Sequence, residues 1–131
     1  MTEKNYRECG SATFELRGNY LYIKYKSDSV VDLPEAKNQS KLILDICQGK
    51  AIPFIIDFLD VSPRIDDESR RFFAIDGPHI HLRKSQAILV NNMQSKLLVN
   101  FYIKHHKPKN PIKLFDNLED ALDWTKQFSA T

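Results

Sequence analysis

Apolar and polar residues alternate with a period of two in two segments near the N-terminus, Thr13–Arg17 and Tyr20–Tyr25. This alternation is typical of strands that have one buried face. Gly18-Asn19 between the segments favours a two-residue hairpin turn, because both residue types tolerate positive φ. The pattern therefore predicts an antiparallel hairpin. Residues 1–11 are polar and show no period, and we expect a disordered or frayed tail there.

Four later segments carry apolar residues at the three- to four-residue spacing of helices. A residue that can cap a helix N-terminus precedes each segment. These residues are Asp32, Asp66, Asn91 or Asn92, and Asp116 or Asn117. Two of the expected helices meet residues that stop a helix, Gly49 and Gly77-Pro78. The sequence therefore predicts four helices with defined first turns.

Three apolar runs lie between these helices: Ile52–Leu59, Ser85–Asn91 and Ile112–Phe115. They are short and rich in β-branched or aromatic residues, and the first two have the near-continuous hydrophobicity of strands buried on both faces. Buried strands separated by a helix indicate parallel crossovers. The predicted class is α/β, with the order β-β-α-β-α-β-α-β-α. No repeat or linker interrupts residues 12–131, and we expect a single domain there.

Composition narrows the partners and the cellular compartment that we expect for this chain. Nineteen basic and seventeen acidic residues give a net charge of +2 in 131 residues, so no global field attracts nucleic acid or an acidic membrane. Cys9 and Cys47 form neither a disulfide framework nor a metal pair. The N-terminus has no apolar signal region, and no run reaches the ~18 apolar residues of a membrane span. We therefore expect a cytoplasmic protein with reduced thiols, no nucleic-acid partner and no integral membrane association.

Motifs for catalysis or cofactor binding are not visible in the sequence. No glycine-rich loop cradles a phosphate, no Gly-x-Ser-x-Gly sequence occurs, and Cys47 lies in an apolar helical stripe. His79 and His81 are two histidines of a connecting segment, whereas a metal needs three or four convergent ligands. We interpret them as solvated loop residues. The chain is expected to be a non-enzyme without metal or cofactor.

Charged side chains form two groups along the chain. A group of acids lies at the end of the central strand and after it. These side chains either bind a cation, act as acid and base, or cap a helix and form a solvated rim. They are Asp57, Asp60, Asp66, Asp67 and Glu68. Asp57 stands apart, because an acid inside a buried strand is costly unless it is paired or placed at the strand's exposed end.

Basic residues gather near the third helix and after it. This group either contacts acidic lipid or protein, or is the solvated end of a helix. It consists of Lys96, Lys104, His105, His106, Lys107, Lys109 and Lys113. The strand with Tyr20, Tyr22 and Tyr25 is either a partner surface or a covered edge, so a homodimer stays open.

A family resemblance rests on three segments in a fixed order. They are the hairpin with Gly18-Asn19, the sequence FIIDFLDV at Phe54–Val61, and Lys113–Asp116 followed by Ala121–Trp124. Together they make residues 12–128 similar to the STAS domain of bacterial anti-sigma-factor antagonists, and more closely to uncharacterised bacterial SpoIIAA-like proteins often described as STAS/SEC14. The resemblance implies a SpoIIAA-like (STAS) fold, with an N-terminal β-hairpin followed by successive βα units, and a regulatory role.

In antagonists of that family, a kinase phosphorylates a serine of an Asp-Ser-Ser-Gly type sequence at a helix start. Asp66 matches the aspartate, Asp67 and Glu68 lie where the serines would be, and Ser69 lies where the glycine would be. Permanent negative charge thus replaces the phosphoacceptor. We expect no phosphorylation switch at this position.

Two hypotheses of function follow. The leading one is a non-catalytic STAS-like module that binds an unknown protein partner through the loop after the central strand and the next helix. The expected contact residues are Asp60, Ser62, Arg64, Asp66, Asp67, Glu68 and Ser69. The alternative is binding of a small apolar or lipid-like ligand, as the SEC14 description implies. Its pocket would be lined by Phe72, Phe73, Leu97, Leu98, Phe101 and Tyr102, unless these side chains only pack the core.

Overall fold

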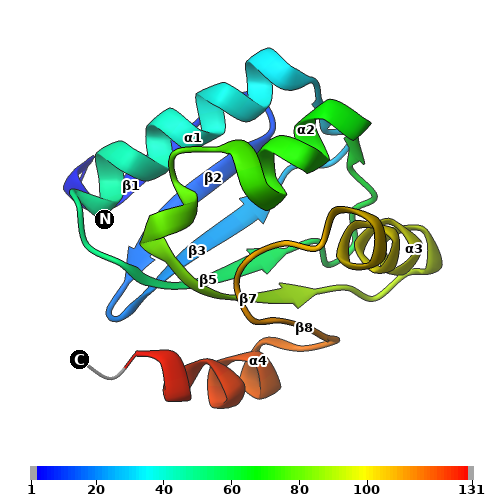
Figure 1. The fold of residues 1–131 in the computed structure, drawn as a ribbon. Helices are drawn as coiled ribbons and strands as arrows, with labels where there is room; N and C mark the ends of the chain where they lie inside the picture. Colours follow the sequence, from blue (N-terminus) through cyan, green and yellow to red (C-terminus); the bar gives the residue numbers. More distant parts are fainter. Residues whose placement is uncertain (1–2, 130–131) are drawn as a thin grey trace.

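The computed structural model describes residues 3–129 and shows one six-stranded sheet with helices on both faces (Figure 1). The strand order is β1-β2-β3-β5-β7-β8. The strands are β1 (Tyr6–Glu8), β2 (Ala12–Arg17), β3 (Tyr20–Tyr25), β5 (Ile52–Asp57), β7 (Arg83–Leu89) and β8 (Ile112–Phe115). The first three pair antiparallel, and β3, β5, β7 and β8 run parallel. A separate parallel pair joins β4 (Val30–Val31) to β6 (Arg64–Ile65).

The described chain has four α-helices, of which three connect strands and the last follows β8. They are α1 (Leu33–Cys47), α2 (Asp67–Arg71), α3 (Met93–Phe101) and α4 (Leu118–Thr125). α2 and α3 each continue directly into a π-helical turn, η2 (Phe72–Asp76) and η4 (Tyr102–His106). Short 3-10 turns cover Glu3–Asn5, Ile80–Leu82 and Lys126–Phe128. The predicted α/β class and its hairpin are confirmed.

Each α-helix begins at a residue that the sequence marked as a cap. Asp32 accepts from the backbone N–H of Glu35, and Asp66 from that of Ser69. Asn92 and Asn117 cap α3 and α4 in the same way. All four hydrogen bonds measure 2.9 to 3.0 Å and satisfy N–H groups that have no partner inside the helix.

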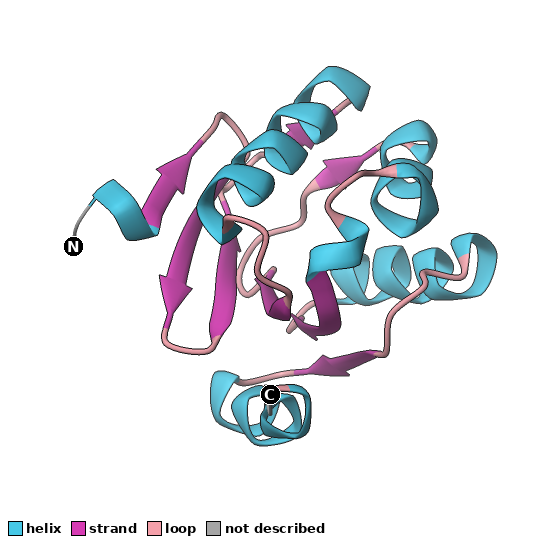
Figure 2. Ribbon diagram, turned by 60° about the vertical axis from the view of Figure 1, so that its left-hand side comes forward, coloured by secondary structure: helices cyan, strands magenta, loops and turns pink. Residues whose placement is uncertain are grey.

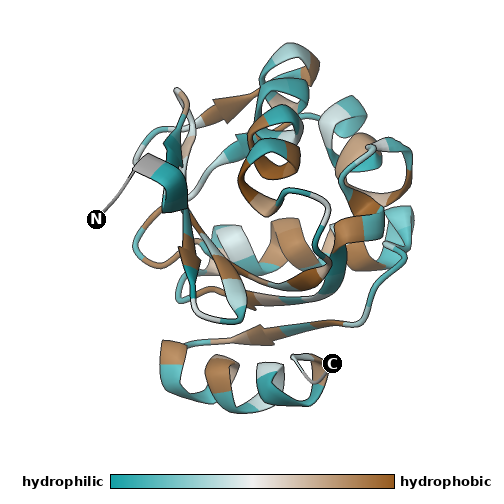
Figure 3. Ribbon diagram, turned by 90° about the vertical axis from the view of Figure 1, so that its left-hand side faces the viewer, coloured by the Kyte–Doolittle hydropathy of each residue, from teal (hydrophilic) through white to brown (hydrophobic). Residues whose placement is uncertain are grey.

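The two faces of the sheet carry unequal cores. α1, α2 and α3 cover one face, and α4 covers the other (Figure 1). The larger core includes Phe14, Ile43 and Phe54 and lies under α1 to α3. The smaller one centres on Ile55 and Leu89 against α4. Figure 3 shows hydrophobic and hydrophilic stretches alternating along the helices, as expected when one helix face is buried.

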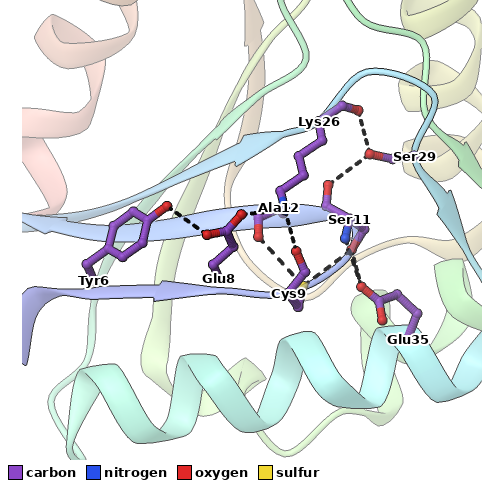
Figure 4. Close-up of polar contacts among 8 residues, drawn as sticks. All are labelled: Tyr6, Glu8, Cys9, Ser11, Ala12, Lys26, Ser29 and Glu35. Carbon is purple, nitrogen blue, oxygen red and sulfur yellow. Dashed lines mark hydrogen bonds and ion pairs between the residues drawn. The ribbon is translucent and has the colours of Figure 1, made fainter. Parts of the chain in front are cut away.

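The expected frayed tail is wrong for residues 3–11. β1 pairs with β2 in a register that places Tyr6 opposite Glu15, and it forms the outer strand of the sheet (Figure 2). The Ser11 backbone N–H and hydroxyl both donate to Glu35 of α1, at 3.0 and 2.6 Å (Figure 4). Polar residues without a period looked unstructured because their partners are distant in sequence. Residues 1 and 2 lie outside the described part of the chain.

Candidate functional site

The segment after β5 places its acids at the surface. Asp60, Ser62, Arg64, Asp66, Asp67 and Glu68 are exposed, as the protein-binding hypothesis requires. Ser69 is fully buried, and its hydroxyl donates to the Val31 carbonyl at 3.3 Å. Ser69 therefore holds the segment against β4 and is not a contact residue. Part of this expected loop is strand β6, which pairs with the equally unexpected β4.

Three adjacent acids at the start of α2 have different surroundings. Hydrogen bonds from Ser69 hold the pKa of Asp66 below its ordinary value. Asp67 pairs with Arg70 at 3.4 Å, and its Oδ1 lies 3.1 Å from Nε2 of His106. The Glu68 side chain makes no hydrogen bond or ion pair with any residue of the described chain. Asp66 is thus a structural cap, whereas Glu68 is free for an outside contact.

An open groove of about 350 Å³ runs beside these acids. Its walls are Val30, Val31, Asp32, Pro63, Arg64, Ile65, Asp66, Arg70 and Leu98. Val30 of β4 is 61% exposed, and Leu97 of α3 is 62% exposed. The surface around the start of α2 therefore combines negative charge with exposed hydrophobic side chains.

A second, smaller cavity of about 60 Å³ lies between the sheet and α1 to α3. Three of the six expected pocket residues, Phe73, Leu98 and Tyr102, line it. Phe72 packs against the ring of Phe73 beside it, while Leu97 and Phe101 are exposed. The apolar spacing in the α3 segment predicted Leu97 and Phe101 as pocket residues, but both lie on the outer side of the helix. Its inner side is formed by Ser95, Leu98, Val99 and Tyr102.

Two polar residues of β7 line this cavity, and sequence reasoning missed both. Arg83 is 4% exposed and Gln86 is 1% exposed. Between the pairs Ile52↔Arg83 and Phe54↔Gln86, β7 advances by three residues while β5 advances by two. In a regular strand, residues three apart point to opposite faces, so this bulge turns both side chains to the same face. The only signal was polar residues just before the apolar run Ala87–Val90.

The buried guanidinium of Arg83 lacks a negative partner. Its Nε donates to the side-chain oxygen of Asn110 at 2.7 Å, and Nη2 has no hydrogen-bond acceptor. Within residues 3–129 no carboxylate forms an ion pair with it. Gln86 Nε2 is also without a partner. Burial lowers the pKa of Arg83 and raises that of the neighbouring Tyr102.

His79 is buried at the same cavity, which corrects its interpretation as a solvated loop residue. It is 1% exposed, and its Nδ1 lies 2.9 Å from the Ser40 hydroxyl of α1. Burial lowers the pKa of His79 to about 3, so the ring is neutral at pH 7. Gly77 is required here, because a Cβ at this position would lie 2.4 Å from the His79 ring. His81, by contrast, is exposed.

Asp57, the acid inside β5, is buried and fully partnered. It accepts hydrogen bonds from the Tyr22 hydroxyl and, at 2.7 Å, from the backbone N–H of Leu59. Lys24 Nζ lies 3.4 Å from its Oδ1 atom. Burial, followed by the neighbouring carboxylate, raises the pKa of Tyr22 above its ordinary value. Asp57 therefore ties β3 to the end of β5.

The remaining candidate groups are not arranged for chemistry in the described structure. Burial raises the pKa of Cys47 to about 11, which leaves its thiol protonated at pH 7. Among residues 3–129, no three His, Cys, Asp or Glu side chains come together as metal ligands. In the basic group, His105 stacks on Phe101 with ring centroids 4.0 Å apart, and Lys104 and Lys107 are exposed.

The strand with Tyr20, Tyr22 and Tyr25 is not an edge of the sheet. β3 lies between β2 and β5, and Tyr25 is buried with its hydroxyl donating to Gln39 at 3.0 Å. A second copy therefore has no free edge to pair with at β3. None of the helices within residues 3–129 has both the length and the apolar character needed to cross a bilayer.

Comparisons with known proteins agree with this fold. A family model described as a domain of unknown function, DUF7793, matches residues 14–129. A search of curated proteins finds no match. A similar solved structure is an uncharacterised DUF3478-family protein with a SpoIIAA-like fold from Shewanella loihica PV-4, determined at 2.25 Å. It is 16% identical, with a TM-score of 0.62 over 88% of this chain and 92% of that chain. The protein thus has a SpoIIAA-like fold and belongs to the DUF7793 family.

Proposed function

We propose that this protein is a non-catalytic STAS-like regulatory module that binds a protein partner at the start of α2. The observation that carries the proposal is the groove between the β4–β6 pair and α3, which has unpaired Glu68 nearby and exposed Val30 in its wall. Protein interfaces combine an apolar centre with a polar rim, and this surface has both. The fold by itself does not identify a function, so the proposal rests on this surface.

The acids at this surface are permanent charges. A phosphorylation switch is not part of the proposal, because Asp67 and Glu68 stand at the positions that match the phosphoacceptor serines. The hydroxyl of the next residue, Ser69, is buried against Val31. Partner choice would instead depend on complementary charge, with basic side chains of the partner facing Asp67 and Glu68. Binding should then weaken as ionic strength rises.

The test is a crosslinking capture from lysate, compared between variants. Asp67→Lys with Glu68→Lys reverses two exposed charges and leaves the Asp66 cap intact. Glu119→Lys is the matched control, because it reverses an exposed acid in the first turn of α4 on the opposite face of the sheet. A protein captured by the wild type and by Glu119→Lys, but lost with the double variant, supports the proposal. Equal capture by the double variant contradicts it.

A second candidate function is binding of a small apolar ligand in the cavity under α1 to α3. The cavity and its unpartnered polar atoms favour it. About 60 Å³ is far below the roughly 300 Å³ of an ordinary ligand site, so a lipid-sized molecule would require α2 and α3 to separate. Native mass spectrometry of gently purified protein tests this function. An excess mass of a few hundred daltons supports it, and a clean mass of the polypeptide alone counts against a lipid-like ligand.

A further inference from the structure

The cavity under α1 to α3 contains a positive charge without a counter-charge. Arg83 is almost fully buried and keeps its proton at neutral pH, as arginine does in proteins. Asn110 occupies only Nε, and an amide oxygen carries no charge. Water entering the cavity would satisfy the free N–H groups but not the charge, and an uncompensated buried charge is costly. An anion is the group that this site lacks.

The donors that face the cavity favour one kind of anion. The β7 bulge brings the free Nη2 of Arg83 and the free Nε2 of Gln86 to the same face. A guanidinium matches the two oxygens of a carboxylate in a planar, bidentate pair. A phosphate brings more charge than Arg83 offsets, because the other arginine of the lining, Arg70, is only part-buried and already pairs with Asp67 at 3.4 Å. The arrangement is therefore suited to a single carboxylate.

Most of the remaining lining is hydrophobic, with ten apolar side chains that include Phe54, Ile88 and Val99. Five residues with polar atoms also line the cavity: Tyr25, Gln39, Arg70, His79 and Tyr102. Tyr25 already bonds to Gln39, and His79 to Ser40. A ligand that reaches Arg83 must place most of its other atoms against the apolar side chains, where further polar groups would lose their hydrogen bonds. The cavity of about 60 Å³ is smaller than the 150 Å³ that binds benzene in an engineered core, so only a short chain fits.

From these observations we propose that the cavity binds a short-chain monocarboxylate, with its carboxylate on Arg83 and Gln86 and its alkyl chain against the hydrophobic wall. This proposal rests on the second candidate function, ligand binding, and names the ligand's chemical class. Both side chains are nine-tenths buried or more. The ligand would complete the hydrogen bonding of two donors, Nη2 of Arg83 and Nε2 of Gln86, that have no partner among the described residues.

Arg70 marks the route into the cavity. Arg70, Ile65 and Leu98 line both the cavity and the outer groove, so they form the wall between the two. The Arg70 guanidinium donates to the Ile65 carbonyl at 2.6 Å and lies 5.2 Å from the centre of the Phe101 ring. Its Nε is unpartnered.

Titration calorimetry with sodium acetate tests the proposal directly. Acetamide has nearly the same shape and no charge, and sodium chloride at equal ionic strength controls for salt. We expect saturable heat from acetate and none from acetamide or chloride. No heat from acetate would overturn this inference, whereas the ligand function on which it rests is decided separately by the native mass spectrum. Equal heat from acetamide would overturn the anionic assignment alone.

Two variants locate the binding site. Arg83→Met should weaken acetate binding at least ten-fold, and Gln86→Leu should weaken it several-fold while the buried cation stays in place. Lys96→Met removes an exposed cation from α3 and should leave binding unchanged. If folded Arg83→Met binds acetate with wild-type affinity, the assignment of the carboxylate to Arg83 is overturned. If Arg83→Met fails to fold, Gln86→Leu and the acetamide comparison decide the same question.

Discussion

Asp57 and Arg83 are buried charged residues on adjacent strands of one sheet, and they differ in what surrounds them. Asp57 lies at the end of β5 with Tyr22, Lys24 and the Leu59 N–H around its carboxylate. Arg83 begins β7, and its hydrogen-bonding neighbours, Asn110 and the Tyr102 hydroxyl, are both neutral. The chain therefore gives the Asp57 carboxylate a full set of partners and leaves the Arg83 guanidinium without a counter-charge.

The difference separates a structural charge from a candidate binding charge. Buried polar groups in folded proteins are nearly always hydrogen-bonded, so each exception requires an explanation. Asp57 is explained by the contacts that join β3 to β5. Nη2 of Arg83 and Nε2 of Gln86 have no hydrogen-bond partner among residues 3–129, and both side chains line a cavity. The comparison thus directs attention to the face covered by α1 to α3, away from the acidic strand end that the sequence made conspicuous.

Replacing Asp57, the buried charge with a full set of partners, should have the largest effect on the free energy of unfolding. Asp57→Ala leaves the Tyr22 hydroxyl and the Leu59 N–H without their acceptor and removes the partner of Lys24. We expect the free energy of unfolding to fall by about 3 kcal/mol, measured by urea denaturation. Asp123→Ala, at an exposed acid of α4, is the control and should change little. A loss below about 1 kcal/mol at Asp57 would mean that its partners find water instead.

His79 extends the comparison to a buried base that is neutral. Its pKa of about 3 in the folded protein lies below the ordinary 6.5, so protonation favours the unfolded chain. The stabilisation is complete above pH 6.5 and is lost as pH falls toward 3. At ~1.4 kcal/mol per pH unit, lowering the pH from 6.5 to about 4.5 should cost roughly 2–3 kcal/mol.

Comparing two histidine variants with the wild type separates the effect of His79 protonation on stability from the effect of carboxylate protonation. His79→Gln keeps a polar group near Ser40 but has no titrating proton, so its stability should fall less steeply with acid than that of the wild type. His81→Gln changes an exposed neighbour and should retain the wild-type slope. Equal slopes for the wild type and both variants would show that the His79 ring is hydrated in the folded protein.

Removing the Arg83 cation, which has no counter-charge, should raise the unfolding free energy, whereas Asp57→Ala lowers it. Arg83→Met loses one hydrogen bond to Asn110 but also removes a buried cation that has no counter-ion. We expect the ligand-free protein to gain about 1 kcal/mol in unfolding free energy, because hydrophobic replacement of buried charge is often stabilising. Urea denaturation in buffer without carboxylates measures it. A loss comparable to that of Asp57→Ala would show that Arg83 is structural and would remove the contrast.

Much of the fold could be predicted because its determinants are local. The hairpin turn, the four capping residues and the apolar runs each depend on neighbours within a few positions, and each appears where expected. β1 could not be predicted from its own polar residues, because pairing with β2 holds it in the sheet, and Ser11 between the two strands donates to Glu35 of α1. The cavity was equally hidden, since a one-residue bulge in β7 decides which face Arg83 takes. Local patterns contain no information about that register.

The acids at the start of α2 give the smallest expected effect, and they test the same distinction at the surface. Asp66 has a defined partner, the Ser69 N–H at 2.9 Å, and Glu68 has none within the described chain. Asp66→Ala should cost about 1 kcal/mol of unfolding free energy, as is usual for a lost N-cap, whereas Glu68→Ala should leave urea denaturation nearly unchanged. Equal losses at both positions would mean that Glu68 has a partner inside the fold, and the acidic surface would then be structural throughout. A loss at Asp66 alone leaves Glu68 with no role in stability, which is the condition for its proposed contact with a partner protein.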